Sequence, residues 1–360
     1  MRWFVTGGTG QVGLAIVAEL LQLDEVETVD CLVRDVARAK RLLPDNPRLR
    51  LLRGDLPLDS AAAAEVSAAL ASCTHLVHSA GLPEQWQPDP AIFHRVNVDG
   101  TSSILAALGE ARRGLTERVR VLLISTMDVC HCEPHGTLVE TREATEADLG
   151  KPGKNTPYEI SKFRQLQVAR RMCAEGAMDL VVLCPSAVYG PCKVKTGLNN
   201  FIADFINGEV PALPSGGFPV CYSKDVALAV LAAARVGRVG ELYLVGGEYL
   251  TNKQVAMAVL VAMEPSPPSE ERMRALERQL PYAIPLWVMR LLAKLSAYPA
   301  WLLGKEPIIP PTIVSFLGWS PRVNCDKAHR ELGYNKDRPF AEGVRSTIES
   351  LRAEGFIKIK

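Results

Sequence analysis

The sequence lacks an excess of charge, a paired cysteine framework and a long uninterrupted apolar run. Its 360 residues contain 41 Lys and Arg against 40 Asp and Glu, and this formal charge of +1 gives no argument for nucleic acid as a partner. The nine cysteines are odd in number and scattered, which favours a reducing compartment over a secreted disulfide scaffold. No apolar run has the length of a bilayer span, and we expect no signal peptide because a core-like run already begins at Trp3. These absences predict a cytoplasmic, globular protein without a transmembrane segment.

What the chain does contain is a regular alternation of short, β-rich apolar runs with helical stretches. Each intervening segment is long enough for a crossover helix. The pattern therefore predicts an α/β fold, with a Rossmann-type, doubly wound parallel sheet wrapped by helices. The expected strands are Trp3–Val5, Thr28–Val33, Leu49–Leu52, His75–His78, Val119–Ile124, Leu180–Cys184 and Glu241–Val245, the last of which returns to the sheet after an excursion.

The later part of the chain is richer in proline and glycine, mixed with apolar stretches. We interpret it as a smaller substrate-binding subdomain that is interleaved with the sheet domain, because no clean linker separates the two. The expected division is 1–190 with 221–248 for the sheet domain, 191–220 with 249–336 for the subdomain, and 337–360 for a C-terminal amphipathic helix.

A glycine-rich turn follows the first expected strand and opens a helix. Glycine is needed where a backbone turns sharply and approaches a pyrophosphate without an intervening Cβ, and the helix N-terminus then offers free N–H groups. A tight turn without a ligand is the alternative, but the position between strand and helix favours a dinucleotide site. The candidate cofactor-binding residues of this turn are Thr6, Gly7, Gly8, Thr9, Gly10, Gln11, Val12 and Gly13.

The end of the second expected strand bears on which dinucleotide binds. An acidic residue there would bind the ribose hydroxyls of NAD, whereas an arginine would accommodate the 2′-phosphate of NADP. Here the strand ends in Arg34, with Arg38 and Lys40 one or two helical turns later. Asp30 lies further back in the strand, and we expect it to point away from the ribose. We predict NADP(H) bound by Arg34, with NAD(H) as the alternative cofactor and a solvated surface charge as the alternative role of Arg34.

A second signal is the pair of Tyr158 and Lys162, four residues apart on one face of an expected helix. Thr156, Pro157 and Glu159 predict the start of that helix through a capping box with proline at its first position. An ammonium beside a phenol stabilises the phenolate and makes the tyrosine a usable acid or base. Any helix can carry such a pair, so the pattern gains meaning only in combination with other residues.

The combination exists, because Ser125 and Thr126 follow an expected strand and place two hydroxyls at the carboxyl end of the sheet. With these residues the chain resembles the extended short-chain dehydrogenase/reductases, in the group of NAD-dependent epimerases and dehydratases. The resemblance covers nearly the whole chain. Its further motifs are Gly54-Asp55-Leu56, Val77-His78-Ser79-Ala80-Gly81, Asn97-Val98-Asp99-Gly100-Thr101, Pro185-Ser186-Ala187-Val188-Tyr189-Gly190-Pro191 and Lys224-Asp225-Val226-Ala227.

The resemblance implies a role for each matching position. Tyr158 would be the proton donor, and Thr126 would be the catalytic hydroxyl with Ser125 as its supporting neighbour. Lys162 would also bind the nicotinamide ribose, while Asn97 would hold the active-site architecture unless it merely caps a helix. The remaining implied cofactor contacts are Asp55 and Leu56 beside the adenine, Ala80 and Gly81 along the cofactor channel, and Pro185, Ser186 and Val188 near the nicotinamide. Two positions depart from the family pattern: Cys184 replaces an arginine and Cys130 an aromatic residue.

Further resemblance, to dihydroflavonol-reductase-like, hopanoid-associated and thioester-reductase-like proteins, implies NADPH-dependent reduction of a carbonyl. The stretch 215–222 has no arginine for the second pyrophosphate of a nucleotide sugar, which argues against the alternative of a sugar-nucleotide epimerase or dehydratase. The apolar stretch 281–303 is open to three interpretations, namely core, substrate lining or membrane contact. If it lines the site, the substrate is lipophilic, aromatic or polyketide-like.

Two further alternatives concern the class of protein. Cys130, His131, Cys132 and His135 carry ligand-type side chains, but their spacing matches no usual zinc pattern, so we expect no metal. A dinucleotide sensor without turnover would have a broken catalytic set, whereas this set is intact. From the family resemblance we also expect a homodimer, formed through helices near Phe93–Arg112 and Tyr158–Glu175.

Overall fold

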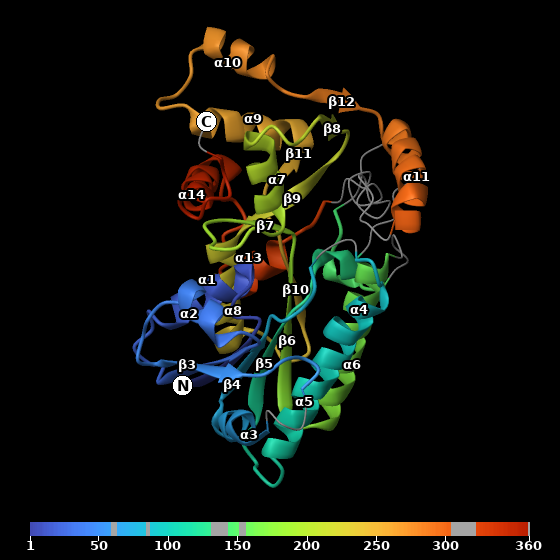
Figure 1. Cartoon of the computed structure of the whole chain (residues 1–360). Helices are drawn as coiled ribbons and strands as arrows, with labels where there is room; N and C mark the ends of the chain where they lie inside the picture. Colours follow the sequence, from blue (N-terminus) through green and yellow to red (C-terminus); the bar gives the residue numbers. More distant parts are fainter. Residues whose placement is uncertain (59–62, 84–86, 131–142, 151–155, 304–321, 359–360) are drawn as a thin grey trace.

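The central sheet has seven parallel strands: β1 (Arg2–Thr6), β2 (Thr28–Val33), β3 (Leu49–Arg53), β4 (His75–His78), β5 (Val119–Ile124), β6 (Met178–Pro185) and β10 (Leu242–Val245). The computed structural model describes residues 1–58, 63–83, 87–130, 143–150, 156–303 and 322–358. The strands lie in the order β10-β6-β5-β4-β1-β2-β3 (Figure 1), which confirms the predicted Rossmann-type α/β fold. The order reverses between β1 and β4, and at such a reversal the carboxyl ends of the strands border a crevice where ligands bind.

Helices cover both faces of this sheet (Figure 1). One face carries α1 (Gln11–Leu20), α2 (Val36–Leu42) and α8 (Ser223–Val236), and α1 packs on α8. The other face carries α3 (Ala63–Ser72), α5 (Gly100–Ala111) and α6 (Pro157–Glu175), with α5 packed between the other two. A short helix α4 (Ala91–Phe93) and a π-helical turn η2 (His94–Asp99) lead directly into α5.

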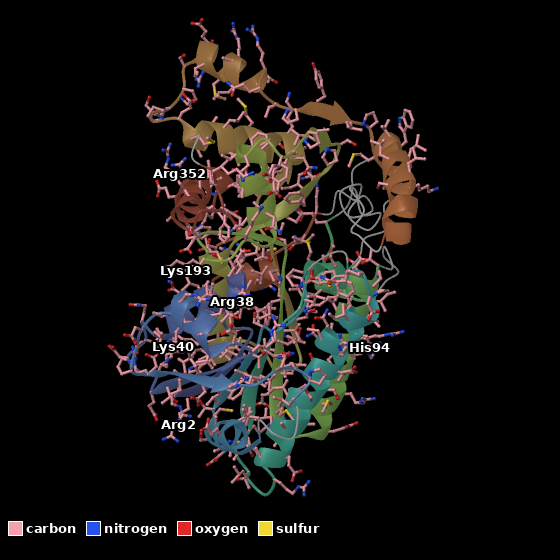
Figure 2. The ribbon with its side chains drawn as sticks, in the orientation of Figure 1. Arg2, Arg38, Lys40, His94, Lys193 and Arg352 are labelled. Atoms are coloured by element: carbon pink, nitrogen blue, oxygen red, sulfur yellow. The ribbon has the colours of Figure 1, made fainter. Side chains whose placement is uncertain are left out.

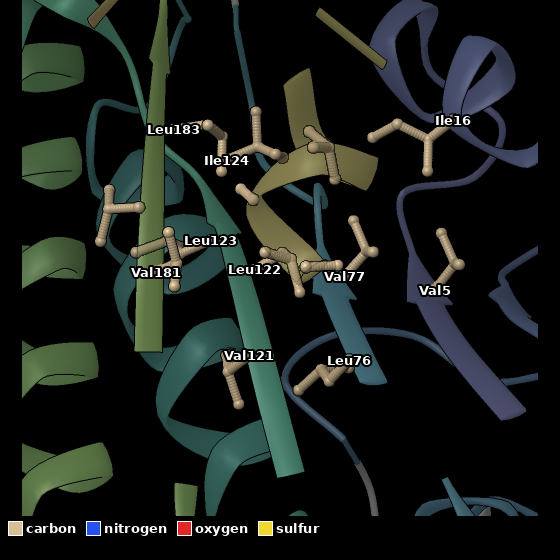
Figure 3. Close-up of a cluster of buried hydrophobic side chains, with 14 of the residues drawn as sticks. Val5, Ile16, Leu76, Val77, Val121, Leu122, Leu123, Ile124, Val181 and Leu183 are labelled. Atoms are coloured by element: carbon tan, nitrogen blue, oxygen red, sulfur yellow. The ribbon is translucent and has the colours of Figure 1, made fainter. Parts of the chain in front are cut away.

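The larger core lies between the sheet and these helices. Figure 3 shows Val5, Val77, Leu122 and Val181, from four different strands, packed in one cluster. Except for the edge strand β3, the strands are buried on both faces, which is why they appear in the sequence as nearly continuous apolar runs. The part of the chain that the structure describes contains no helix with both the length and the apolarity needed to cross a membrane.

A smaller subdomain lies beyond the carboxyl ends of the strands (Figure 1). In one of its sheets β9 (Gly217–Tyr222) pairs with both β11 (Tyr249–Thr251) and β7 (Ala187–Tyr189), and in the other β12 (Tyr282–Ile284) pairs with β8 (Ala212–Pro214). Its helices are α7 (Leu198–Ile206), α9 (Asn252–Met263), α10 (Glu270–Glu277), α11 (Leu286–Leu303) and α14 (Phe340–Ala353). The second core joins residues such as Tyr189, Ile202, Val255 and Phe340.

The packing departs from the expected division of the chain in two places. Tyr189 and Tyr222 pack in the smaller core, although we had expected 187–190 and 221–222 in the sheet domain, whereas Cys221 packs in the larger core as expected. Conversely, α13 (Asp326–Leu332) packs against β10 and α8 and adds Ala328 and Leu332 to the larger core. The reason is that β10 is an edge strand whose apolar face needs a covering helix.

Candidate active site

The glycine-rich turn joins β1 to α1 and touches the chain that leaves β4. Gly7 has a φ of +73°, and a Cβ on it would lie 2.5 Å from the backbone nitrogen of Ala80. A Cβ on Gly13 would lie only 2.1 Å from the carbonyl oxygen of Gly7. Both positions therefore require glycine. Gly10 precedes α1 and has no side chain to cap it, so the first N–H groups of the helix are left for a ligand.

Gln11 opens α1 and supplies a second indication of a ligand. Its side chain is buried, yet its Nε2 has no hydrogen-bond partner among the residues that the structure describes. Gly197 packs close to this side chain. A Cβ on Gly197 would be 3.3 Å from Oε1 of Gln11 and 3.4 Å from the carbonyl oxygen of Val188. A buried amide donor is normally satisfied, and a phosphate oxygen would satisfy this one. The residues around the turn therefore fit a nicotinamide dinucleotide.

The carboxylates near the end of β2 are engaged elsewhere. Asp30 is buried and pairs with Arg50 on β3, as expected of a residue that points away from the ribose. Asp35 caps α2 by accepting a backbone N–H at 2.9 Å. Arg34 is exposed, and its Nε lies 3.8 Å from Oδ1 of the exposed Asp55. Arg34 and Asp55, predicted at the adenosine end for separate reasons, are thus neighbours in the structure.

Lys193 adds a positive charge that no sequence motif indicated. It belongs to the smaller subdomain, but its Nζ donates to the carbonyl oxygen of Arg41 at the end of α2, at 3.2 Å. Figure 2 places Lys193 and Arg38 on the same edge of the molecule. The smaller subdomain therefore brings a cation against the C-terminal end of α2.

The catalytic helix begins as predicted. The Thr156 hydroxyl accepts the N–H of Glu159 at 3.2 Å, and the Glu159 carboxylate accepts the N–H of Thr156 at 3.1 Å. This capping box places Tyr158 and Lys162 in the first turns of α6, and both side chains are buried. The Tyr158 ring packs edge-on against Phe93, with ring centroids 6.3 Å apart.

Lys162 is an ammonium held in a poorly solvated place. Burial lowers its pKa from 10.5 to about 8, and the negative charge of Asp128 opposes this lowering. Its Nζ donates to the carbonyl oxygen of Ile124, the last residue of β5, at 3.1 Å. A Cβ on Gly81 would lie 3.7 Å from the same Nζ. Lys162 therefore stands where the ends of β4 and β5 meet α6.

The two predicted hydroxyls at the end of β5 have different surroundings. The Ser125 hydroxyl lies beside the buried Cys184 thiol and has no hydrogen-bond partner among the described residues. The Thr126 hydroxyl donates to Oδ2 of Asp128 at 3.0 Å, and also accepts the Asp128 N–H at 3.3 Å. Asp128 is buried and was not among the predicted site residues. A carboxylate two residues beyond the predicted catalytic threonine was the signal that could have identified it.

Asn97 lies inside the π-helical turn η2, so the alternative role as a helix cap does not fit. It is fully buried, and its Oδ1 accepts the N–H of Leu82 at 2.8 Å. Its Nδ2 donates to Oγ of Ser161 at 2.9 Å, and Ser161 in turn donates to the carbonyl oxygen of Tyr158 at 2.7 Å. Asn97 thus ties the segment after β4 to the turn of α6 that carries the tyrosine. Local π-helical turns often accompany functional sites in this way.

A buried histidine extends this polar network, and sequence reasoning missed its role. His78 bonds Thr6 through Nδ1 and Thr101 through Nε2, both at 2.7 Å. The Thr101 hydroxyl proton is already donated to the carbonyl oxygen of Asn97, so Nε2 of His78 must carry the hydrogen. Nδ1 then accepts from Thr6, so the Thr6 hydroxyl is committed to His78. Burial lowers the pKa of His78 to about 3, and the nearby Lys162 charge adds to the effect.

Of the remaining predicted cofactor residues, Pro185 and Ser186 lie at this edge of the sheet, whereas Val188 lies in β7 and Leu56 faces away. Pro185 ends β6, and Ser186 follows at the point where the chain leaves for β7, with its hydroxyl beside Cys221. The Leu56 side chain packs within 3.2 Å of a Cβ position on Gly100 in α5. It therefore faces the helix layer.

The expected departures from the family pattern form a small thiol cluster. Cys130 and Cys184 are buried, and burial raises the pKa of Cys130 to about 12 and that of Cys184 well above its ordinary value. Both remain protonated thiols at neutral pH. His131, Cys132 and His135 lie outside the described residues, within which no group of three metal-ligating side chains occurs.

Comparison with known proteins agrees with this geometry. The family model of the NAD dependent epimerase/dehydratase family matches residues 3–246. A Synechocystis protein assigned as a dihydroflavonol 4-reductase is 26% identical over 99% of this chain and 96% of its own. A dTDP-glucose 4,6-dehydratase of Streptomyces antibioticus is 26% identical over 98% and 92%. A 4-hydroxy-2-methyl-3-oxo-4-farnesyl-3,4-dihydroquinoline-1-oxide ketoreductase of Stigmatella aurantiaca is 26% identical over 99% and 97%.

Solved structures share the fold along the whole chain. The dTDP-glucose 4,6-dehydratase DesIV of Streptomyces venezuelae, crystallised with NAD and TYD bound, superposes with a TM-score of 0.72 over 99% of each chain at 21% identity. The family match over residues 3–246, the parallel sheet and the glycine turn lead to one conclusion. The chain belongs to the NAD-dependent epimerase/dehydratase family and is an NAD(P)-dependent enzyme of the extended short-chain dehydrogenase/reductase type.

Proposed function

We propose that the protein is an NADPH-dependent reductase acting on a ketone or aldehyde of a small lipophilic, aromatic or polyketide-like molecule. The observation that carries the proposal is Arg34, an exposed arginine at the end of β2. The carboxylates of Asp30 and Asp35, which lie closest to it along the chain, are engaged in other contacts. An arginine fork suits a 2′-phosphate, which distinguishes NADPH from NADH.

The side chains at the end of β5 and on α6 would perform the protein's part of the reduction. A bound NADPH would supply the hydride that the carbonyl carbon accepts. Tyr158 would pass its phenolic proton to the carbonyl oxygen, and the Thr126 hydroxyl, turned from Oδ2 of Asp128 to the substrate, would orient that oxygen. Lys162, through its ammonium, would stabilise the phenolate that Tyr158 leaves behind. The bond from Asn97 to Ser161 would keep this turn of α6 in place.

The subdomain supports an apolar substrate. Arg338 stacks on Tyr222 of β9, but its guanidinium is paired with Asp225 and lies 3.5 Å from Glu342. The second pyrophosphate of a nucleotide sugar would have to compete with these carboxylates for the arginine. The ketoreductase relative, whose name carries a farnesyl group on a quinoline oxide, points in the same direction.

The second candidate is a sugar-nucleotide epimerase or dehydratase. It is favoured by the dTDP-glucose 4,6-dehydratase relative, which matches nearly the whole chain at the same identity as the ketoreductase. Assays with NADPH and a panel of aromatic, polyketide-like and long-chain carbonyls would separate the two candidates. Turnover of nucleotide sugars with tightly bound NAD, and of none of the carbonyls, would contradict the proposal.

Arg34→Ala tests the cofactor preference. We expect it to weaken NADPH by roughly 10- to 100-fold, the loss of a charge-assisted phosphate contact, and to change NADH little. Arg113→Ala is a matched control, because Arg113 is equally exposed and also pairs with one carboxylate, that of Glu110. Dissociation constants for both cofactors follow from quenching of protein fluorescence. Equal losses of affinity for NADPH and NADH would show that Arg34 does not bind the 2′-phosphate. They would also remove the basis for preferring NADPH.

A further inference from the structure

Helix α11 stands apart from both cores. Its inward residues Met289 and Ala293 are buried, and they pack with Ile284 of β12 in a small cluster of their own. Figure 1 shows α11 at the outer edge of the molecule, next to β12. Of the three interpretations of this apolar stretch, packing in a core therefore applies only to its inward side.

The outward side of α11 is apolar as well. Trp287, Leu291 and Leu295 follow one another at intervals of four residues and so share one face of the helix. Their exposed fractions are 69%, 49% and 64%, respectively. Tyr282 on the preceding strand is 89% exposed. Single exposed apolar residues are ordinary, but a continuous stripe of them marks an interaction surface.

The charges beside this stripe have a single sign. Arg290 and Lys294 are exposed, again four residues apart, and lie along one border of the stripe. The chain contains no Asp or Glu from Arg278 to Leu303. An aromatic and aliphatic stripe bordered by cations matches an interface of acyl chains beneath anionic headgroups.

We propose that the α11 stripe (Trp287, Leu291, Leu295) with Tyr282 docks the protein on an anionic lipid surface. The helix would lie in the plane of the headgroups, with its outward side chains inserted and its cations against the phosphates. A second copy of the chain fits less well. A two-fold contact would bring the stripe and its cationic border against themselves, with no carboxylate between Arg278 and Leu303 to compensate.

The docking surface is independent of the proposed reduction, since it rests on a face of α11 and on no residue of the cofactor or catalytic site. If the enzyme docks in this way, substrates dissolved in the lipid layer would reach it by diffusion in two dimensions. Binding through one short stripe is reversible and weakens with salt, because a single amphipathic helix gives marginal anchoring.

Flotation of the full chain with vesicles tests the proposal. Wild type should float with vesicles of phosphatidylcholine and phosphatidylglycerol, less so with phosphatidylcholine alone, and less again in high salt. Leu291→Glu should weaken binding by about tenfold or more, since a carboxylate would face the headgroups where an apolar group was inserted. Leu228→Glu is the matched control: Leu228 is also an exposed leucine, 44% accessible, but lies on α8.

Dinucleotide binding by each variant, measured in parallel, shows whether its fold is intact. The double variant Arg290→Glu with Lys294→Glu removes the cations without changing the stripe, and it should also weaken vesicle binding. Wild-type binding that Leu291→Glu leaves unchanged would overturn the proposal, as would the absence of wild-type flotation with anionic vesicles. A dimer that Leu291→Glu converts to a monomer would overturn it too, by assigning the stripe to a second copy. Carbonyl reductase activity is not measured in any arm, so failure here and failure of the proposed function are separate results.

Discussion

Lys162 combines burial, a backbone hydrogen bond and a lowered pKa at one position. Its ammonium is buried, donates to the Ile124 carbonyl at the end of β5, and has a pKa lowered to about 8 by burial. A lysine this close to neutrality responds strongly to nearby charge. A phenolate at Tyr158, one turn earlier, and a dinucleotide phosphate would both favour its charged form. Under the proposed function, Lys162 would couple the cofactor to the proton donor.

Tyr158→Phe separates catalysis from binding. If Tyr158 supplies the proton only in the transition state, the substitution should lower kcat by about 10²- to 10⁴-fold, the usual range for losing a positioned general acid. Dinucleotide binding should stay nearly unchanged, because the phenyl ring preserves the packing against Phe93. Steady-state kinetics and fluorescence titration measure the two quantities.

Lys162→Met is the informative companion to that variant. It should damage turnover and cofactor affinity together, since its ammonium would serve both the phenol and the ribose. Full activity of Tyr158→Phe on the true substrate would mean that another group donates the proton.

Between elements, the decisive feature is the hydrogen-bonded path through His78. Thr6 at the end of β1 donates to His78 on β4, and His78 donates to Thr101 on α5. Thr101 also accepts from Gln165 of α6 at 2.9 Å. Because every donor in this path is assigned, the elements that carry the glycine turn and the tyrosine share one rigid polar core. A protonated imidazole would leave Nδ1 and the Thr6 hydroxyl as two facing donors.

This arrangement predicts a pH dependence of stability with a definite sign. The folded pKa of His78 is about 3 and its ordinary value is 6.5, so between these values the unfolded chain binds more protons. His78 therefore contributes stability that is fully present above pH 6.5 and is lost as the pH falls toward 3. The slope from this residue approaches about 1.4 kcal/mol per pH unit.

His78→Asn provides the comparison. It keeps an acceptor for Thr6 but does not titrate, so the free energy of unfolding should depend less steeply on pH between 4 and 6 than in wild type. At pH 7 the variant should be less stable by about 1–3 kcal/mol, because Thr101 loses a buried donor. Denaturant unfolding at several pH values measures both effects. If the free energy of unfolding depended on pH equally in the two proteins, His78 would not be responsible for the loss of stability in acid.

At the scale of the whole molecule, we predict a homodimer through α5 and α6. These helices pack side by side on one face of the sheet, and Ile160 on α6 is exposed. Light scattering at micromolar concentration should give twice the mass of one chain, and Ile160→Arg should shift it toward the monomer, because a charge would be buried in the contact. Leu228→Arg, on α8 and the opposite face, should leave the mass unchanged. A monomer in wild type would contradict the prediction.

The sequence by itself determined the strands, the glycine turn and the capped start of α6, because these depend on neighbours in the chain. A parallel strand buried on both faces must be apolar along its length. A turn as tight as that of Gly7 and Gly13 leaves no room for a Cβ, and a capping box spans only Thr156 to Glu159. The family followed from these local patterns taken together.

Only the tertiary structure decided which groups meet across the sheet. The contacts of His78 with Thr6 and Thr101, of Arg34 with Asp55, and of Lys193 with α2 join residues that lie far apart in the chain. Their partners are chosen by strand order and helix packing, which hydrophobic periodicity does not specify. The same holds for exposure. A run such as that of α11 has the same composition whether a neighbour covers it or not, and here the fold leaves Trp287 and Leu295 uncovered.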